Sequence, residues 1–300
     1  MPRRPLRTGL LVAMAASQAC QQPASRVPTG GTLVVYDAGS VAGPLKAALD
    51  TFAARDGVTI DHQTASTVET TRKLTALHQI PDLIALSDER PFPTQLVPQY
   101  TTWYARFGRD RMTIAYTYES KYSDQLTPRN WYQILARPNV QVGRADPASD
   151  PNGAQTLLTL RLAEHYYHQP GLYAAQLRAV PDSNVRPTQA DLFDRLQADK
   201  LDYVWSLASY AHGDGVKTVA LPPEIAGPII VALSVPTAAP HPDLAARAAA
   251  YVLSADGQRI MRAAHLEPLD TVQLVGSGAP TIIWHSIAGS PPVSPTPSSK

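Results

Sequence analysis

The chain has 300 residues, a formal net charge of +1 and one cysteine. This length is enough for two medium lobes or one large α/β unit. The small net charge excludes a strong field for holding nucleic acid or an anionic membrane, and the single cysteine excludes an intramolecular disulfide.

The N-terminal segment has the pattern of an export signal followed by an anchor. Arginines precede a short apolar run from Leu10 to Ala16, and small residues follow before Cys20. The run is too short to span a bilayer, so we expect a signal peptide at residues 1–19. Cleavage there would expose Cys20 for lipidation, although Ser17 stands where a lipobox usually has Leu; an unmodified Cys20 is the alternative. Residues 20–30 then serve as anchor and linker.

Strand and helix patterns alternate along the first part of the mature chain. The predicted elements are, in order, a strand at Thr32–Tyr36, a helix at Pro44–Ala54, a strand at Val58–His62, a helix at Thr67–Leu77 and a strand at Asp82–Leu86. Apolar runs indicate the strands, and apolar residues at helical spacing indicate the helices. This β-α-β-α-β order is typical of a mostly parallel sheet.

A second α/β series begins near Met112. Its predicted strands are Thr113–Thr117, Val140–Val142, Asp202–Trp205 and Ile229–Leu233, and its predicted helices are Asn130–Leu135, Gly153–His168, Asp191–Ala198, Asp243–Val252 and Gln258–Ala264. Strand-like crossings near residues 110–113 and 226–230 separate the two series. We therefore expect an α/β protein with two lobes joined by two crossing strands.

The crossings set the expected limits of the lobes. Lobe 1 would comprise residues 31–111 and 228–275, and lobe 2 residues 112–227. Residues 276–300 would form a Pro/Ser-rich tail.

Three turns that follow predicted strands have the composition of anion-binding sites. Ser40 follows the first strand, Ser66 the second, and Asp150 with Pro151 opens a long helix. Helix N-termini present free N–H groups, and ligands of open α/β sheets bind beyond the carboxyl ends of the strands. We therefore expect these turns to meet in one cleft that receives an oxyanion. The alternative for each side chain is an ordinary helix cap or turn residue.

Asp150 and Gln189 have less obvious roles in such a cleft. A carboxylate at Asp150 would repel a dianion. It would fit only as a ligand of the anion's central atom, or as the acceptor of a hydrogen bond from a protonated oxyanion. Gln189 stands near the start of a predicted helix, where its amide could donate into the cleft or simply face solvent.

Patterns of catalysis and cofactor binding are missing from the sequence. It has no nucleophile elbow, P-loop, dinucleotide fingerprint, Cys/His metal set or aromatic-basic face for nucleic acid. We therefore expect a protein that is not an enzyme and that uses no cofactor and no bound metal. An enzyme built on its acidic residues, and a sensory receptor that docks on a signalling protein, remain alternatives.

Several segments resemble the archaeal-type tungstate/molybdate-binding proteins. They are Tyr36-Asp37-Ala38-Gly39-Ser40, Ala65-Ser66, Arg72-Lys73-Leu74, Thr113-Ile114-Ala115-Tyr116, Lys121-Tyr122, Asn130-Trp131-Tyr132-Gln133-Ile134-Leu135, Arg137-Pro138-Asn139-Val140, Asp146-Pro147, Asp150-Pro151-Asn152-Gly153 and Leu162-Ala163-Glu164-His165-Tyr166-Tyr167. The similarity covers residues 31–270. It implies a type II periplasmic-binding-protein fold. It also implies a monomer, tethered outside the cytoplasm, that hands tungstate or molybdate to an ABC permease.

The resemblance also implies which residues bind the oxyanion. Ser40 and Ser66 match two serines that bind it. Asp150 matches an aspartate that completes six-coordination around the metal. The backbone N–H of Asn152 stands where the family supplies another donor, usually from a cysteine.

Two positions depart from the family pattern. Gln189 stands where the family has a glutamate, and Leu207 where it has a tyrosine. An oxyanion oxygen left without its donor would cost about 1–3 kcal/mol. Ser206, Ser209 or Tyr210 could supply the missing hydroxyl. A different small anion, phosphate-like or organic, is therefore an alternative ligand for the same fold.

Overall fold

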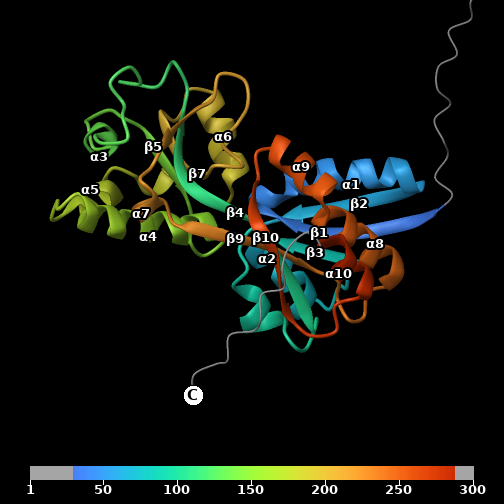
Figure 1. Cartoon of the computed structure of the whole chain (residues 1–300). Helices are drawn as coiled ribbons and strands as arrows, with labels where there is room; N and C mark the ends of the chain where they lie inside the picture. The colour runs from blue at the N-terminus through green and yellow to red at the C-terminus, as the bar shows by residue number, and fades with distance from the viewer. Residues whose placement is uncertain (1–29, 288–300) are drawn as a thin grey trace, which may run out of the picture.

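The computed structural model describes residues 30–287 (Figure 1). The expected signal peptide, Cys20 with its lipidation, the linker up to residue 29 and the last thirteen residues of the expected tail lie outside the described residues. Among the helices of residues 30–287, none has the length and apolar character needed to cross a membrane.

The described chain is an α/β protein whose sheet runs through two lobes (Figure 1). The strands are β1 (Gly30–Ala38), β2 (Val58–Ala65), β3 (Leu83–Leu86), β4 (Trp103–Tyr116), β5 (Val142–Ala145), β6 (Val185–Arg186), β7 (Tyr203–Leu207), β8 (Lys217–Ala220), β9 (Pro228–Ser234) and β10 (Glu267–Gly276). Their order in the sheet is β2-β1-β3-β9-β4-β7-β5-β6, and β8 and β10 both pair with β4.

Helices cover the sheet in both lobes. They are α1 (Ala42–Asp56), α2 (Thr67–Thr75), α3 (Trp131–Leu135), α4 (Pro151–Tyr166), α5 (Leu172–Arg178), α6 (Gln189–Gln197), α7 (Pro223–Ala226), α8 (Pro242–Leu253), α9 (Ala255–Ala263) and α10 (Thr281–Ile287), with short turns η1 (Gly39–Val41), η2 (Phe92–Leu96) and η3 (Asp182–Asn184). In Figure 1, α3 to α7 surround one half of the sheet, and α1, α2 and α8 to α10 surround the other.

The strands β4 and β9 pass between the lobes (Figure 1). Up to Arg111, β4 pairs antiparallel with β9, and Arg111 lies opposite Pro228. From Met112 onward, β4 pairs with β7 and β8 instead. In the structure, lobe 1 therefore comprises residues 30–111 and 228–287, and lobe 2 the residues between them.

Each lobe has its own apolar core. In lobe 1, α1 buries Leu45, Leu49 and Phe52 at helical spacing, and it packs with α8 and α9 over the sheet. In lobe 2, Trp131 of α3 and Trp205 of β7 are fully buried and meet edge to face, with ring centroids 5.2 Å apart. Two separate cores allow the lobes to move as rigid bodies about β4 and β9.

Charged side chains explain why the first half of β4 was not expected as a strand; β6, β8 and β10 were also not expected. The first half of β4 interrupts its apolar pattern with Arg106, Arg109 and Arg111, so only its last residues read as a strand. In the structure, Arg109 and Arg111 pair with Glu267 of β10, which was also missed. The strand expected at Val140–Val142 is shifted along the chain and forms β5.

Part of the expected tail belongs to lobe 1. The segment Thr281–Ile287 forms α10, and Ile283 is fully buried in the core beside α8. The expectation of a tail from residue 276 is therefore wrong for this helix. The Pro/Ser-rich residues that follow it obscured its apolar side chains.

Ile283→Ala should lower the free energy of unfolding by about 2–4 kcal/mol, because it leaves a cavity in the lobe 1 core. The matched control is its neighbour Ile282, which is 40% exposed. Ile282→Ala should cost less than about 1 kcal/mol. Urea unfolding of both variants measures the difference, and equal losses would contradict the packing of α10.

Candidate functional site

A cavity of about 200 Å³ lies between the lobes, beyond the carboxyl ends of the strands. Lobe 1 lines it with Gly39, Thr64, Ala65 and Ser66, and lobe 2 with Asp150, Thr188, Gln189, Ala190 and Tyr210. Larger hollows occur beside α8 and α10 and beside the ion pairs of β4. The interlobe cavity is the candidate site, because the starts of three helices from both lobes lie at its wall.

Three helices begin at the wall of the cavity. Ser66 caps α2, Asp150 caps α4 and Thr188 caps α6; each side-chain oxygen accepts a backbone N–H of its own first turn, at 3.2, 2.9 and 3.3 Å respectively. The dipoles of all three helices and the other first-turn N–H groups of α2 and α6 create a positive potential. At α4, Pro151 has no N–H, and the N–H groups of Asn152 and Gly153 donate to Asp150. Helix starts from both lobes therefore face the same small volume, which suits an anion.

Two glycines allow the backbone to approach closely here. Gly39 has a φ of 55°, and a Cβ there would lie 2.8 Å from the Ser87 hydroxyl oxygen. At Gly153, a Cβ would lie 2.5 Å from the carbonyl oxygen of Ala145, at the end of β5. The start of α4 can therefore rest directly on its preceding strand only because residue 153 lacks a side chain.

Ser40 and Asn152 lie behind the cavity wall. Ser40 is 2% exposed and its hydroxyl has no hydrogen-bond partner within residues 30–287. The N–H of Asn152 donates to the Asp150 carboxylate, its Nδ2 donates to the Trp205 carbonyl at 3.1 Å, and its Oδ1 is buried without a partner. The structure thus brings Ser66, Asp150 and Gln189 to the cavity, and places Ser40 and Asn152 next to it.

The Gln189 side chain is held in one orientation by β7. Its Oε1 accepts the Ser206 hydroxyl at 3.0 Å and the Leu207 backbone N–H at 3.1 Å. The Leu207 backbone N–H can only donate, so the side-chain atom of Gln189 that faces it must be the acceptor Oε1 and not Nε2. The Nε2 amide is then the group that Gln189 offers to the cavity. Leu207 itself is buried in the lobe 2 core and contributes to the site by orienting this amide.

Asp150 is the acidic group of the cavity wall. Burial raises the pKa of its carboxyl above the usual value, and the backbone N–H groups of Asn152 and Gln189 partly offset this effect. Burial also raises the pKa of Tyr210, as do the nearby charges of Asp194 and Asp150. The Tyr210 hydroxyl therefore stays protonated and is available as a donor.

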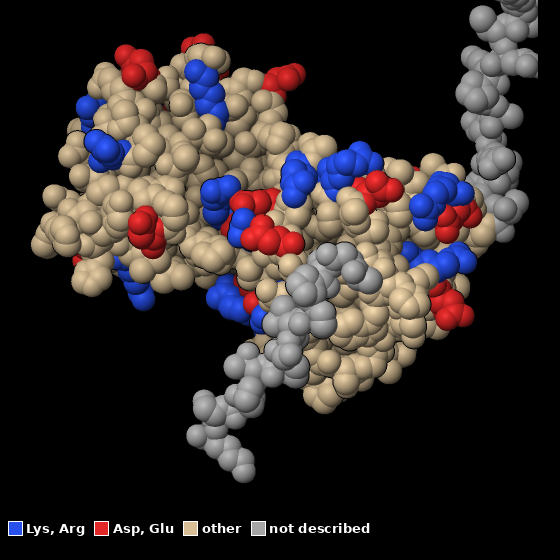
Figure 2. Space-filling view, viewed as in Figure 1, with Lys and Arg blue, Asp and Glu red and all other residues tan. Residues whose placement is uncertain are grey.

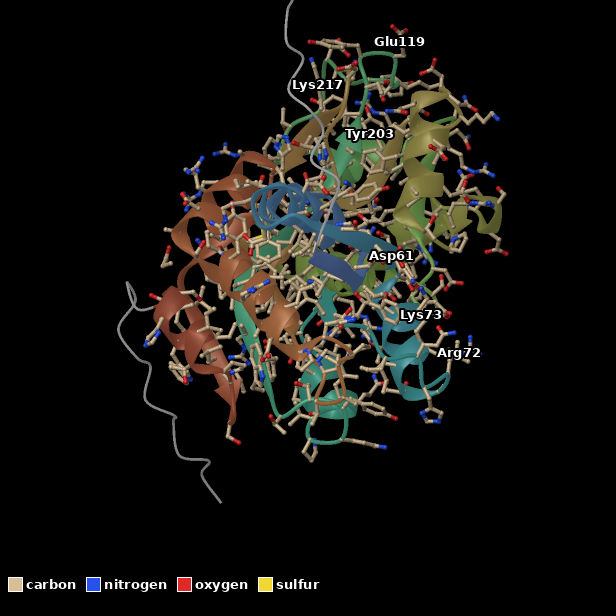
Figure 3. The ribbon with its side chains drawn as sticks, turned by 90° about the vertical axis from the view of Figure 1, so that its right-hand side faces the viewer. Asp61, Arg72, Lys73, Glu119, Tyr203 and Lys217 are labelled. Carbon is tan, nitrogen blue, oxygen red and sulfur yellow. The ribbon has the colours of Figure 1, made fainter. Side chains whose placement is uncertain are left out.

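Basic side chains do not line the described cavity. Arg186 is engaged in an ion pair with Asp191 at 2.5 Å. Arg72 and Lys73 lie on α2 (Figure 3), where Arg72 is exposed and Lys73 lies over the Tyr36 ring. On the face shown in Figure 2, basic and acidic side chains are interspersed, including at the junction of the lobes. An anion here would be held by neutral donors and helix N-termini.

The sequence analysis missed several residues of the cavity. Thr188 carries a recognisable signal, because it precedes Asp191 by three residues at a helix start. Thr64 belongs to the small-residue turn Thr64-Ala65-Ser66 that the sequence marks as an anion-site turn, although it was not named as a binding residue. Its hydroxyl donates to Asp37, whose other carboxylate oxygen lies 2.7 Å from His62 Nδ1. Tyr210 was considered only as one of three substitute hydroxyls.

Comparison with known proteins identifies the family. A family model described as "Bacterial extracellular solute-binding protein" matches residues 33–267. The chain belongs to this family. An uncharacterized solute-binding protein of Methanoculleus marisnigri is 31% identical over 76% of this chain and 79% of its own.

Two further relatives extend this comparison. The molybdate/tungstate-binding protein WtpA of Pyrococcus abyssi is 29% identical over 78% of this chain and 83% of its own. An uncharacterized solute-binding protein of Petrotoga mobilis is 36% identical, and the match spans 65% of this chain and 61% of that protein.

Solved structures of the same fold include two with named anions. The sulfate-binding protein SubI of Mycobacterium tuberculosis has a TM-score of 0.65 at 15% identity, covering 87% of this chain and 92% of its own. The periplasmic molybdate-binding protein of Azotobacter vinelandii has a TM-score of 0.62 at 14% identity, covering 78% and 98%. At these identities the likeness shows the fold alone, and it confirms the expected type II periplasmic-binding-protein architecture.

Asp150→Asn should change how stability depends on pH. Because burial raises the folded-state pKa of Asp150 above 3.8, the folded protein binds this proton more tightly than the unfolded chain does. The wild type should therefore lose unfolding free energy relative to Asp150→Asn as the pH rises from 3.8 through the folded-state pKa. Asparagine caps a helix as well as aspartate does, so the cap is preserved.

Urea unfolding of both proteins at several values between about pH 4 and pH 7.5 measures this difference. A difference in unfolding free energy that stays constant over the range would contradict the raised pKa.

Proposed function

We propose that this solute-binding protein captures a tetrahedral oxyanion, tungstate or molybdate, outside the cytoplasm and delivers it to an ABC permease. The observation that carries the proposal is the convergence of three helix N-termini, from both lobes, on one small cavity. The donors at its wall suit an ion with oxygen on every side. The name of the Pyrococcus abyssi relative supports the choice of oxyanion.

Capture would work through closure of the lobes on the ion. Ser66 reaches the cavity from lobe 1, whereas Asp150, Gln189 and Tyr210 reach it from lobe 2. An anion that contacts both sets binds the closed form more tightly than the open form, so it shifts the population toward closure. The permease would then recognise the closed form. The anion leaves unchanged, so the proposed function includes no catalysis.

Ser40 and Asn152 complete the proposed binding set. They adjoin the lining residues Gly39 and Asp150, and the Ser40 hydroxyl has no hydrogen-bond partner within the described chain, so it is free to donate. The donor that Asn152 would offer is its backbone N–H, which donates to the Asp150 carboxylate. A small rotation of the Ser40 turn would bring its hydroxyl to the ion. Anchoring of the receptor through a lipid on Cys20 would keep it close to the permease.

Asp150 sets the condition under which a dianion can bind. A carboxylate and a fully deprotonated oxyanion cannot share a buried contact unless a proton or the anion's central atom lies between them. The raised pKa of Asp150 favours the first solution, in which the carboxyl group donates a hydrogen bond to the anion. In the second solution, the ionised Asp150 carboxylate binds directly to the central atom of the anion.

Ser66→Ala should weaken binding of sodium tungstate by about tenfold, through loss of one donor at the wall. The matched control is Ser254→Ala, because Ser254 caps α9 in the same way but lies outside the cavity. Both changes should lower stability by about 1 kcal/mol through the lost cap. Only Ser66→Ala should raise Kd in isothermal titration calorimetry.

The same titrations with molybdate, sulfate and phosphate test the choice of anion. We expect tungstate and molybdate to bind tightly and sulfate weakly. Absence of binding by both metal oxyanions to the wild type would overturn the proposed ligand.

A different small anion is the second candidate, and the orientation of Gln189 favours it. With Oε1 held by β7, Gln189 offers a donor where a glutamate would offer an acceptor. A cavity with one carboxyl group and several donors also suits a protonated, phosphate-like oxyanion, with Asp150 as the acceptor of its proton. Tight binding of phosphate without tungstate would support this candidate.

Gln189→Glu should weaken binding of either oxyanion by at least about tenfold, because it replaces a donor with a second negative charge. Gln197→Glu is the control, since Gln197 is exposed at the other end of α6 and makes the same charge change. Calorimetry on both variants separates the local effect from that of net charge. Stronger tungstate binding by Gln189→Glu would instead indicate that a second carboxylate ligates the metal.

A further inference from the structure

A buried carboxylate lies at the junction of the lobes, outside the set of residues that line the cavity. Asp110 is on β4, just before the strand changes its pairing partners, and it is 4% exposed. Its neighbours Arg109 and Arg111 both pair with Glu267, and Asp110 makes no ion pair within residues 30–287. Burial raises the pKa of Asp110, and hydrogen bonds to its carboxyl oxygens oppose that shift. A buried carboxyl group without a cation needs such hydrogen bonds, so the residues that donate them show what holds Asp110 in place.

The main donor to Asp110 comes from lobe 2. The hydroxyl of Ser209 donates to one carboxylate oxygen at 2.5 Å, and its backbone N–H donates to the other at 3.2 Å. The N–H of Arg111 donates to that second oxygen at 2.8 Å. Ser209 lies in the turn after β7 and is itself 1% exposed.

The same network reaches the Ser40 turn of lobe 1. The Ser209 hydroxyl oxygen lies 3.4 Å from the Ser40 carbonyl oxygen. The Ser40 hydroxyl is buried in the same turn and has no hydrogen-bond partner within residues 30–287. The crossing strand, a turn of lobe 2 and a turn of lobe 1 therefore meet at one buried carboxylate.

Each of these two turns also contributes a residue to the cavity wall. Tyr210 directly follows Ser209, and Gly39 directly precedes Ser40; both line the cavity. Any displacement of Ser209 relative to Ser40 would change the distance between the two walls.

We propose that Asp110 is a positioning residue of the ligand site. Through Ser209 it holds the Ser209–Tyr210 turn of lobe 2 against the Ser40 turn of lobe 1, and so sets the width of the closed cavity. The effect on ligand affinity rests on the proposed oxyanion function. The effect on the arrangement of the lobes does not.

The test compares Asp110→Ala, Ser209→Ala and the double variant with the wild-type protein. Calorimetry with sodium tungstate gives Kd, and small-angle X-ray scattering with and without tungstate gives the separation of the lobes. Each single change should weaken binding by about tenfold or more, because it removes a hydrogen bond to a buried charge. The double variant should bind no more weakly than Asp110→Ala, since both changes break one contact.

Asp82→Asn is the matched control for stability. Asp82 is also fully buried and accepts the backbone N–H groups of Val34 and His241, at 2.8 and 2.7 Å, but all three residues lie in lobe 1. This variant should have a lower Tm with an unchanged Kd and an unchanged scattering profile. Asp110→Asn should restore part of the affinity lost in Asp110→Ala, because an amide keeps one acceptor oxygen for Ser209.

The outcomes separate this inference from the proposed function. If the wild type binds none of the oxyanions, the scattering of ligand-free Asp110→Ala still tests the contact and should show more widely separated lobes. Unchanged Kd and unchanged scattering in Asp110→Ala would overturn the positioning role. Independent, additive losses at Asp110 and Ser209 would also overturn it.

Discussion

The structure depends on helix N-termini from two lobes meeting at the end of one sheet. Backbone N–H groups in the first turn of a helix have no partner within the helix, so each start needs an acceptor. Here the caps Ser66, Asp150 and Thr188 each accept an N–H of their own helix. At α4, Pro151 has no N–H and Gly153 donates to the Asp150 carbonyl oxygen, so this helix offers a ligand its dipole, and the backbone donors come from α2 and α6. Because these donors are part of the backbone, their position is fixed by the packing of the helices on the sheet. An anion can therefore be recognised without a cationic side chain, whose flexible stem would have to be ordered on binding.

An ionised carboxylate in such a cavity repels an anion, and burial resolves this conflict. The positive helix ends stabilise ionised Asp150, whereas loss of water destabilises it. Where the second effect is larger, the group can keep a proton and donate it to the ligand. The same reasoning distinguishes anions by their own protons, because an anion that carries a proton needs Asp150 as an acceptor. Selectivity among oxyanions would then depend on whether Asp150 or the anion carries the shared proton, and less on the size of the cavity.

Much of the fold could be predicted from the sequence, and the missing parts have physical causes. Buried strands such as β1 and β3 are continuous apolar runs. Ser66 follows β2 and Asp150 follows β5, each directly before a helix, so the sequence alone could predict that both lie at the carboxyl ends of strands. The first half of β4 was hidden because Arg106, Arg109 and Arg111 are paired only with residues distant in sequence. The orientation of the Gln189 side chain depends on the backbone N–H of Leu207 in β7. Because Leu207 is distant in sequence, the residues around Gln189 do not predict this contact. Tyr210 was one of three candidate hydroxyls in the sequence, and the structure places it at the cavity wall. The contact of Asp110 with Ser209 is visible only when the lobes are placed together.

A receptor that must also release its ligand needs a closed state only slightly more stable than the open one. An apolar contact between the lobes would favour closure with or without ligand, because opening would expose apolar surface to water, which is unfavourable. The Asp110–Ser209 contact behaves differently. If the contact breaks on opening, water hydrates the carboxyl group and the Ser209 hydroxyl, so the loss of the contact is partly compensated. Such a contact defines the geometry of the closed state and stabilises it only modestly, so its removal loosens the lobes while ligand binding still determines whether they close.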